Sequence, residues 1–299
     1  MIKINGLDKY LGGEKILDDI NIHIKKGSIF GLVGPNGAGK TTLIKCLVDI
    51  YKPEKGEVII SGENIKDNKK IKSRVGYVSD FQYFYPSFKI SEIAEFYKGA
   101  YPHWNDDRYI RLMNLFKLDG KKKAKHLSKG MKTQFAIILN LSIMPEVLIL
   151  DEPTSGLDPV VKRKVLNLIV EEVSTNKTTV LISSHNLGHL EQICDHIGII
   201  HEGKILLEDS IEDLKSNVRK IQVAFKGELP EDIKNNKHIL RVDSIGRIHQ
   251  IVVKDNLETV MEAIKIHNPI LLETIDMSLE EIFIYEMGGE GYVFEDIAL

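Results

Sequence analysis

A chain of 299 residues is long enough for one large domain and one small one. Its residues are 43% hydrophobic and 28% charged, as in ordinary globular proteins, and its formal net charge of −3 gives no general electrostatic attraction to nucleic acid. The amino-terminus lacks the apolar stretch of a signal peptide, and the most apolar region, 135–150, is too interrupted to span a bilayer. We therefore expect any role at a membrane to come through a partner.

Residues 1–30 are expected to form short strands with a turn at Gly12 and Gly13. Tyr10 lies within this stretch. Its ring could be a packing residue or a platform for a base, and the residues alone leave both interpretations open.

The next stretch has the order strand, glycine-rich loop, helix. The apolar run 29–33 lies between glycines and predicts a buried strand. The loop 34–41, GPNGAGKT, fits the phosphate-binding pattern G-x-x-x-x-G-K-[ST], and apolar residues recur at helical spacing behind it. This combination predicts a binding site for a nucleotide triphosphate.

The chemistry of such a loop assigns its residues. Glycines let backbone N–H groups and the positive end of the following helix approach phosphates. Lys40 would place a cation on the β- and γ-phosphates, and the Thr41 hydroxyl would bind Mg²⁺. The ATP-binding residues expected here are Gly34, Pro35, Asn36, Gly37, Ala38, Gly39, Lys40, Thr41 and Thr42.

Helical periodicity runs through 90–118 and breaks near Pro102. The segment 75–88 before it is rich in aromatic residues. These rings either fill the local core or help to form a groove that receives a helix of a membrane partner; the rings concerned are Phe81, Tyr83, Phe84 and Tyr85.

The residues 147–153, VLILDEP, predict a buried strand that ends in two acids, behind an apolar helix that opens at 127–132. Downstream of a phosphate loop, such a strand end carries the carboxylate associated with Mg²⁺, so we expect Asp151 to orient the metal shell. Glu152 would polarise the attacking water as general base.

A helix over 159–173 and a strand over 179–183 come next. Beyond them lie three histidines and a cysteine, His185, His189, Cys194 and His196, whose side chains can bind zinc. They fall at a strand end, on a helix and beyond it, without a matching second pair, so we do not expect a zinc site. Cys194 and Cys46 are far apart in sequence, which suits two free thiols in a reducing cytosol.

The alternation of apolar strands and helices up to residue 214 predicts an α/β fold with a mostly parallel sheet and helices on both faces. The pattern then changes to a β-β-β-α-β-α unit that we expect to be ferredoxin-like, an α+β arrangement. Its last helix should open at Ser278, because Glu281 completes a capping box. The elements predicted are strands 220–225, 238–243, 247–253 and 270–276 and helix 256–267.

With these pieces in order, residues 1–215 resemble the nucleotide-binding subunit of an ABC transporter, a P-loop NTPase. The loop 34–42 resembles the Walker A motif, and 147–152 resembles Walker B. LSKGMK at 127–132 matches the signature motif at Leu127, Ser128 and Gly130, with Lys129 and Met131-Lys132 in place of the commoner letters.

The resemblance implies further roles. Tyr10 would stack on adenine, Asp158 would belong to the D-loop, and His185 would be the switch histidine that senses the γ-phosphate. The family usually has Gln shortly after G-Y-x-x, where it touches Mg²⁺. Here that position holds Asp80, and Gln82 follows two residues later, so either could be the ligand.

The resemblance also implies a domain division and a mode of action. Residues 1–214 would form the nucleotide-binding domain, with a helical subdomain at about 85–140, and 215–299 a small accessory or regulatory domain. The chain would hydrolyse ATP as a head-to-tail dimer with itself or a homologous subunit, in which Ser128 and Gly130 contact the partner's ATP.

This dimer would lie in the cytoplasm on the inner face of the membrane, bound to an integral membrane permease. LSKGMK, the stretch 101–104 and the carboxy-terminal extension are most similar to exporters of drugs, peptides or antibiotics. Two alternatives remain: a soluble ABC ATPase that acts on nucleic acid or ribosomes, and a module that binds ATP without hydrolysing it. Missing insertions argue against the first, and Glu152 argues against the second.

Overall fold

The computed structural model describes residues 1–254 and 256–288. Two compact units make up the chain, one ending at Glu208 and the other beginning at Asp209. This boundary lies slightly before the one expected at 214, because helix α8 (Ile211–Asn217) packs against α11 (Leu279–Gly288) of the second unit.

The first unit is built on a six-stranded sheet in the order β10-β9-β3-β8-β7-β6. The pairs β3–β8, β3–β9, β7–β8 and β6–β7 are all parallel, so the predicted mostly parallel sheet is confirmed. Its three central strands are buried along their whole length, as their continuous apolar runs require. The strands are β3 (Ile29–Val33), β6 (Val75–Val78), β7 (Val147–Asp151), β8 (Thr179–Ser184), β9 (His196–His201) and β10 (Lys204–Ser210).

A second, antiparallel sheet in the same unit has the order β2-β1-β4-β5. Its first two strands have ten and eleven residues, longer than the short strands predicted for 1–30, and they turn at Gly12 and Gly13 as expected. The strands are β1 (Ile2–Leu11), β2 (Glu14–Ile24), β4 (Lys55–Ile60) and β5 (Glu63–Asn64). Helix α2 (Lys69–Lys72) follows.

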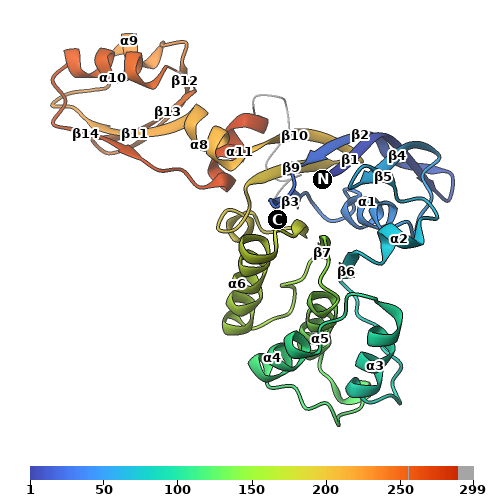
Figure 1. Ribbon diagram of the computed structural model, residues 1–299. Coiled ribbons are helices and arrows are strands. Elements are labelled where there is room, and N and C mark those ends of the chain that lie inside the picture. The colour runs from blue at the N-terminus through green and yellow to red at the C-terminus, as the bar shows by residue number, and fades with distance from the viewer. Residues whose placement is uncertain (255, 289–299) are drawn as a thin grey trace. The chain divides into compact units, whose positions relative to one another are not determined.

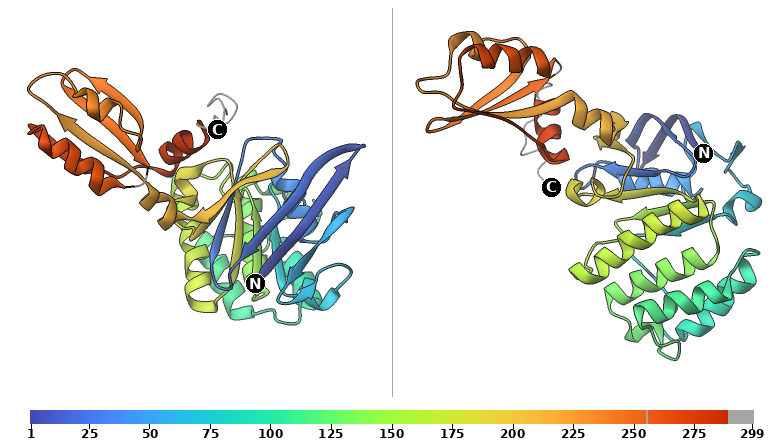
Figure 2. Two further views of the ribbon diagram at one scale, coloured as in Figure 1. Left: turned by 90° about the horizontal axis from the view of Figure 1, so that it is seen from above. Right: turned by 60° about the vertical axis from the view of Figure 1, so that its left-hand side comes forward.

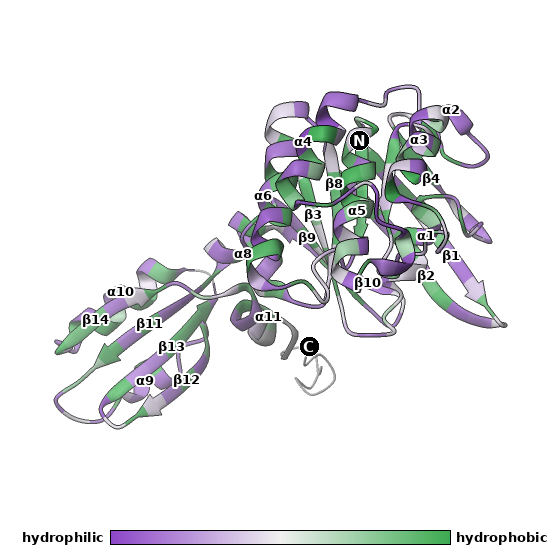
Figure 3. Cartoon of the chain, turned by 90° about the horizontal axis from the view of Figure 1, so that it is seen from below, coloured by the Kyte–Doolittle hydropathy of each residue, from purple (hydrophilic) through white to green (hydrophobic). Residues whose placement is uncertain are grey.

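Helix α1 (Lys40–Leu47) contributes to one core that both sheets share. Leu43, Ile44 and Leu47 of this helix are fully buried among residues of both sheets, including Ile2 and Ile149. In Figure 3 the hydrophobic colour recurs along the strands and helices, and hydrophilic residues alternate with it. This packing fixes the start of α1, and with it the loop 34–39 that precedes it.

Three helices gather in a lobe that extends away from α1 and the antiparallel sheet (Figure 1). They are α3 (Ile90–Ala100), α4 (Asp106–Phe116) and α5 (Lys129–Ser142), with the short 3₁₀ helix η1 (Ala124–His126) between the last two. The predicted helix break near Pro102 is confirmed, since α3 and α4 are separate helices. Two further helices, α6 (Pro159–Asn176) and α7 (Leu187–Leu190), pack against β8.

The second unit is a four-stranded antiparallel sheet in the order β12-β13-β11-β14. Helices α9 (Glu231–Lys234) and α10 (Leu257–Ile266) share an apolar core with the sheet; Figure 2 shows α10 lying along it. The predicted order of three successive strands was wrong, because α9 lies between the first two. The strands are β11 (Val218–Ala224), β12 (Ile239–Ile245), β13 (Ile248–Lys254) and β14 (Leu271–Ile275).

The last described helix, α11, begins as predicted. Glu281 accepts hydrogen bonds from the backbone N–H of Ser278, and the Ser278 hydroxyl accepts one from the Glu281 N–H, which makes the capping box. Among the helices within 1–254 and 256–288, none is long and apolar enough to cross a membrane.

Candidate functional site

The phosphate loop has a backbone that only glycine permits at two positions. A Cβ atom on Gly34 would lie 2.2 Å from the carbonyl oxygen of Ile200, and one on Gly39 would lie 2.9 Å from a methyl group of Leu17. Gly39 also has a φ of 107°, which side chains rarely tolerate. The loop is therefore held close to β9 and β2, with its open side directed away from them.

The loop presents unused hydrogen-bond donors. Among the described residues, the backbone N–H groups of Gly39, Lys40 and Thr41 find no acceptor, whereas the Ala38 N–H donates to the Pro35 carbonyl oxygen at 3.2 Å. These N–H groups lie at the amino-terminal end of α1, where the helix dipole favours an anion. The geometry fits a phosphate group.

The Lys40 side chain folds back onto the phosphate loop. Its ammonium donates to the carbonyl oxygens of Gly34 at 2.5 Å and Pro35 at 3.0 Å. Burial lowers the pKa of Lys40 from its ordinary value, and the nearby carboxylates of Glu152 and Asp151 oppose that shift. A buried cation that donates to two carbonyl oxygens is suited to a stronger, anionic partner. The remaining predicted loop residues, Pro35, Asn36, Gly37 and Thr42, flank this cation in the same segment.

The predicted metal-binding pair is brought together. The Thr41 hydroxyl donates to Oδ2 of Asp151 at 2.8 Å, although the two residues lie 110 positions apart. Asp151, at the carboxyl end of β7, is almost fully buried. The Ser183 hydroxyl donates to its other oxygen at 2.7 Å. A hydroxyl and a buried carboxylate beside a phosphate loop form a donor set that fits Mg²⁺.

Glu152 and His185 also meet. Oε2 of Glu152 lies 3.0 Å from Nδ1 of His185, and the Glu152 side chain is only 14% exposed. Glu152 has a φ of 50°, an uncommon conformation for a residue other than glycine. Its backbone N–H donates to the Ser183 hydroxyl at 3.0 Å, which stabilises this conformation. Strained backbone of this kind clusters at functional sites.

Ser183 was missed by the sequence analysis, although it joins both acids through one hydroxyl. The available signal was its position: it lies next to the last residue of β8, a buried strand that runs parallel to β7, and Asp151 is its partner in the register. Polar residues at the carboxyl ends of neighbouring parallel strands lie along one edge of the sheet.

Tyr10 is 40% exposed on β1, and its backbone N–H donates to Glu54. The ammonium of Lys15 lies 5.9 Å from the centre of its ring. The ring is therefore partly open to solvent, and its stacking on a base stays a prediction. No contact in the described chain joins it to the phosphate loop.

The signature residues form a separate part of the surface. Ser128 is the N-cap of α5, where its hydroxyl accepts from the Met131 N–H at 3.2 Å. A Cβ on Gly130 would lie 3.2 Å from Leu157, in the segment that leads to α6. Asp158 is the N-cap of α6 and accepts from the N–H groups of Val160 and Val161. Figure 1 shows α5 in the helical lobe and α1 among the strands.

Neither proposed metal ligand after β6 contacts Thr41 or Asp151. Oδ1 of Asp80 lies 3.6 Å from the ammonium of Lys129, and the side-chain amide of Gln82 donates to the Ser79 carbonyl oxygen. The choice between Asp80 and Gln82 as metal ligand stays open.

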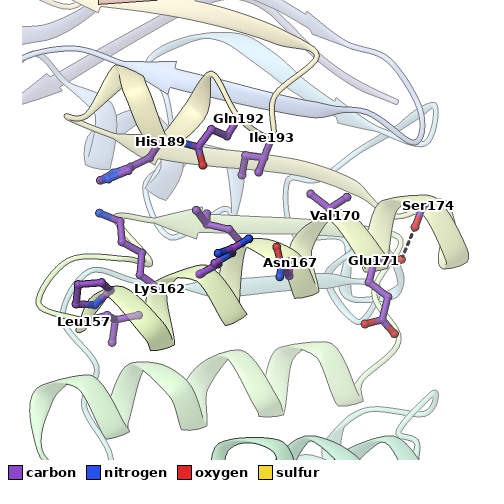
Figure 4. A pocket seen from close by; sticks show the side chains of 12 residues that line it. Leu157, Lys162, Asn167, Val170, Glu171, Ser174, His189, Gln192 and Ile193 are labelled. Atoms are coloured by element: carbon purple, nitrogen blue, oxygen red, sulfur yellow. Dashed lines mark hydrogen bonds between the residues drawn. The ribbon is translucent and has the colours of Figure 1, made fainter.

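A cleft of about 970 Å³ lies between α6 and the segment 189–193, away from the phosphate loop (Figure 4). Lys162 and His189 are at one end of it, and Glu171 and Ser174 at the other. Burial and the charge of Lys162 lower the pKa of His189. Within the residues that the structure describes, no group of three or more His, Cys, Asp and Glu side chains is placed to hold a metal ion.

Comparisons with known proteins agree with this geometry. Residues 17–155 match the family model described as ABC transporter. The chain is 31% identical over 290 residues to the ABC transporter ATP-binding protein YtrB of Bacillus subtilis, covering 97% of this chain and 99% of that protein. It is 40% identical to the bacitracin transport ATP-binding protein BcrA of Bacillus licheniformis, covering 74% of this chain and 73% of that one.

Among solved structures, the fold is similar to the dimeric structure of MJ0796, a bacterial ABC transporter cassette. The TM-score is 0.64 at 25% sequence identity, and the match covers 71% of this chain and 99% of that one.

Proposed function

The chain belongs to the ATP-binding proteins of ABC transporters, and from this premise we propose that two copies bind MgATP between them and drive a separate exporting permease. It is an ATP-binding and ATP-hydrolysing subunit. The observation that best supports the proposed mechanism is the hydrogen bond between Thr41 and Asp151, together with the contact between Glu152 and His185.

The phosphate loop would bind the nucleotide. Lys40 would leave the carbonyl oxygens of Gly34 and Pro35 for the phosphates, and the free N–H groups of the loop would donate to them. Thr41 and Asp151 would hold Mg²⁺, which neutralises phosphate charge when it is bound. Tyr10 would stack on the adenine ring.

Glu152 would act as general base. Its carboxylate would accept a proton from the attacking water, and His185 would orient that carboxylate through the hydrogen bond at Nδ1. The Ser183 hydroxyl would hold Asp151 and the backbone of Glu152 in fixed positions relative to each other through its two hydrogen bonds. Asp151 would therefore bind the metal ion, and Glu152 would activate the water.

The second half of each site would come from a second subunit. Ser128 and Gly130 begin a 14-residue helix, whose free amino-terminal end favours an anion. They lie in the lobe of α3, α4 and α5 rather than beside α1, which supports their use on a partner's nucleotide (Figure 1). Asp158, as N-cap of α6, would place the D-loop at the same interface. The dimeric state of the similar cassette supports this arrangement.

An exposed aromatic patch would bind the permease. We define it as Phe81, Tyr83 and Tyr85, which are 76%, 70% and 67% exposed. The fourth ring of the segment, Phe84, packs against Phe135 with their centres 5.2 Å apart, so only this ring fills the core. Exposed rings of this size favour an interaction surface, and a cytoplasmic helix of the permease is the occupant we propose. The subunit would then lie at the cytoplasmic face of the membrane.

The second unit would be an accessory or regulatory domain of ferredoxin-like fold, and residues 1–214 the nucleotide-binding domain, with its helical subdomain at about 85–140. The order β-α-β-β-α-β and the antiparallel strand directions support the ferredoxin-like assignment. The relative from Bacillus subtilis matches across this unit as well as the first.

The name of the bacitracin transport relative supports export of a peptide antibiotic. The test is multiple-turnover ATP hydrolysis by the purified chain, followed by the same assay with its permease added. We expect hydrolysis by the chain and a change of rate when permease and a peptide antibiotic are added. A chain that binds ATP but releases no phosphate over many turnovers, with or without the permease, would contradict the proposal.

A further inference from the structure

Two residues that depart from the pattern of the resembling family meet in the structure. Asp80 stands where glutamine is usual after β6, and Lys129 replaces a residue of the signature motif. Oδ1 of Asp80 and Nζ of Lys129 are 3.6 Å apart, although the residues are far apart in sequence. The opposite charges of these two residues, which belong to separate motifs, therefore balance each other.

Lys129 stands at a helix position that disfavours a cation. It is the first residue of α5, and the first turn of this helix contains no acidic residue. The positive end of a helix dipole disfavours a cation and favours an anion. The carboxylate that compensates the charge comes from another segment, Asp80. A charge that is unfavourable within its own helix, and is compensated by a residue of another segment, is expected at a functional site.

The Lys129 side chain also points toward a loop of the proposed composite site. Its stem passes over Gly156, where a Cβ would lie 3.7 Å from Lys129 Cδ. Gly156 and the neighbouring Leu157 lie between Glu152 and the D-loop residue Asp158. The ammonium of Lys129 therefore lies at the surface formed by the signature, the D-loop and the segment after β6.

We propose that Lys129 is an anion ligand of the composite site, held by Asp80 in the separate subunit and transferred to a phosphate of the partner's nucleotide when the dimer closes. This inference rests on the proposed function, because it requires the signature of one subunit to face the nucleotide of the other. Asp80 then competes with that nucleotide and limits closure.

The ion pair with Asp80 is weaker than the contact with phosphate that would replace it. Lys129 and Asp80 are 56% and 50% exposed, and an exposed ion pair is weak and easily broken. A phosphate carries more charge and accepts charge-assisted hydrogen bonds in a site from which closure excludes water. The pair can therefore hold Lys129 in the open subunit without preventing its transfer.

The experiment measures ATP-driven dimerisation by light scattering, with Glu152→Gln as the background so that bound ATP persists. Lys129→Met should weaken dimerisation about tenfold, as expected for the loss of a charge-assisted contact. Asp80→Asn should strengthen it by about two- to fivefold, since it removes a weak competitor. In the Lys129→Met background, Asp80→Asn should have no further effect. Lys125→Met, an exposed lysine of η1 outside the signature motif, is the control and should leave dimerisation unchanged.

ATP binding to the dilute monomer, followed with a fluorescent analogue, should be the same in all these variants. If Asp80→Asn instead weakens dimerisation and nucleotide binding, Asp80 serves the metal and the inference is wrong. It is also wrong if Ser128→Arg blocks dimerisation while Lys129→Met does not weaken it. If Ser128→Arg leaves dimerisation intact, the composite site itself is contradicted, and the proposed function with it.

Discussion

Arg108 of α4 and Glu172 of α6 form a buried ion pair that joins the helical lobe to the body of the first unit. The Glu172 carboxylate is fully buried and accepts further hydrogen bonds from Asn176 at 3.1 Å and Thr178 at 3.0 Å. A second pair, Arg111 with Glu171, lies beside it on the same two helices but is largely exposed. This buried charged pair therefore joins the lobe that carries the signature to α6.

We predict that Arg108→Met lowers the free energy of unfolding by about 3–5 kcal/mol, because it leaves the Glu172 carboxylate buried without its cation. Arg111→Met is the matched control and should cost less than about 1 kcal/mol, since its pair is exposed to water. Urea unfolding followed by the fluorescence of Trp104, the single tryptophan of the chain, measures both. Equal losses in the two variants would show that burial of the pair does not matter.

The second prediction concerns Glu152. Glu152→Gln should keep ATP binding and slow hydrolysis by about 10²–10⁴-fold, because the amide cannot accept the proton of the attacking water. Single-turnover release of phosphate measures the step directly. Glu95→Gln, on the exposed face of α3, is the control and should hydrolyse ATP at the wild-type rate. Wild-type turnover in Glu152→Gln would remove this residue from the mechanism.

The third prediction uses the pKa of Lys40, which burial lowers below its ordinary value. Only the ammonium form attracts phosphate, so ATP affinity should fall as the pH rises through this lowered pKa. For the same reason, ATP binding at alkaline pH should take up a proton, because phosphate favours the charged form. Calorimetry at about pH 9 in buffers of different ionisation enthalpy measures the uptake. Lys40→Ala should bind weakly and lose this uptake; uptake that persists in the variant would assign it to another group.

The fourth prediction concerns the aromatic patch. Replacing Phe81, Tyr83 and Tyr85 together by serine should leave the ATPase activity of the isolated subunit near that of the wild type. It should also reduce recovery of the subunit with its co-expressed permease, because the exposed rings supply the apolar contact. Phe96→Ser is the control, since Phe96 is 74% exposed on α3 outside the patch. Equal losses for the patch and the control would contradict a specific docking surface.

Much of the first unit could be predicted because its signals are local. The apolar runs that end in Val33 and Asp151 identify buried strands by length and composition, and the glycine pattern of the loop has few other uses. Both strands belong to one parallel sheet, so their carboxyl ends meet at one edge. The contact of Thr41 with Asp151 follows from that arrangement.

Other features depend on distances that sequence does not give. The helix α9 has only four residues, too few for a periodic pattern. The pairs Arg108–Glu172 and Lys129–Asp80 join segments that only the packing of the lobe brings together. Ser183 looked like the polar end of a strand, and its two hydrogen bonds became visible only beside β7.

The central claim is that a complete ATP-hydrolysing site needs two subunits, and the dependence of ATPase rate on protein concentration tests it most directly. At low concentration, where light scattering detects monomers, the rate per subunit should rise in proportion to concentration; it should become constant once MgATP holds most chains as dimers. A rate per subunit that stays constant at the wild-type maximum while the protein remains monomeric would contradict the account, because one chain would then contain the whole site.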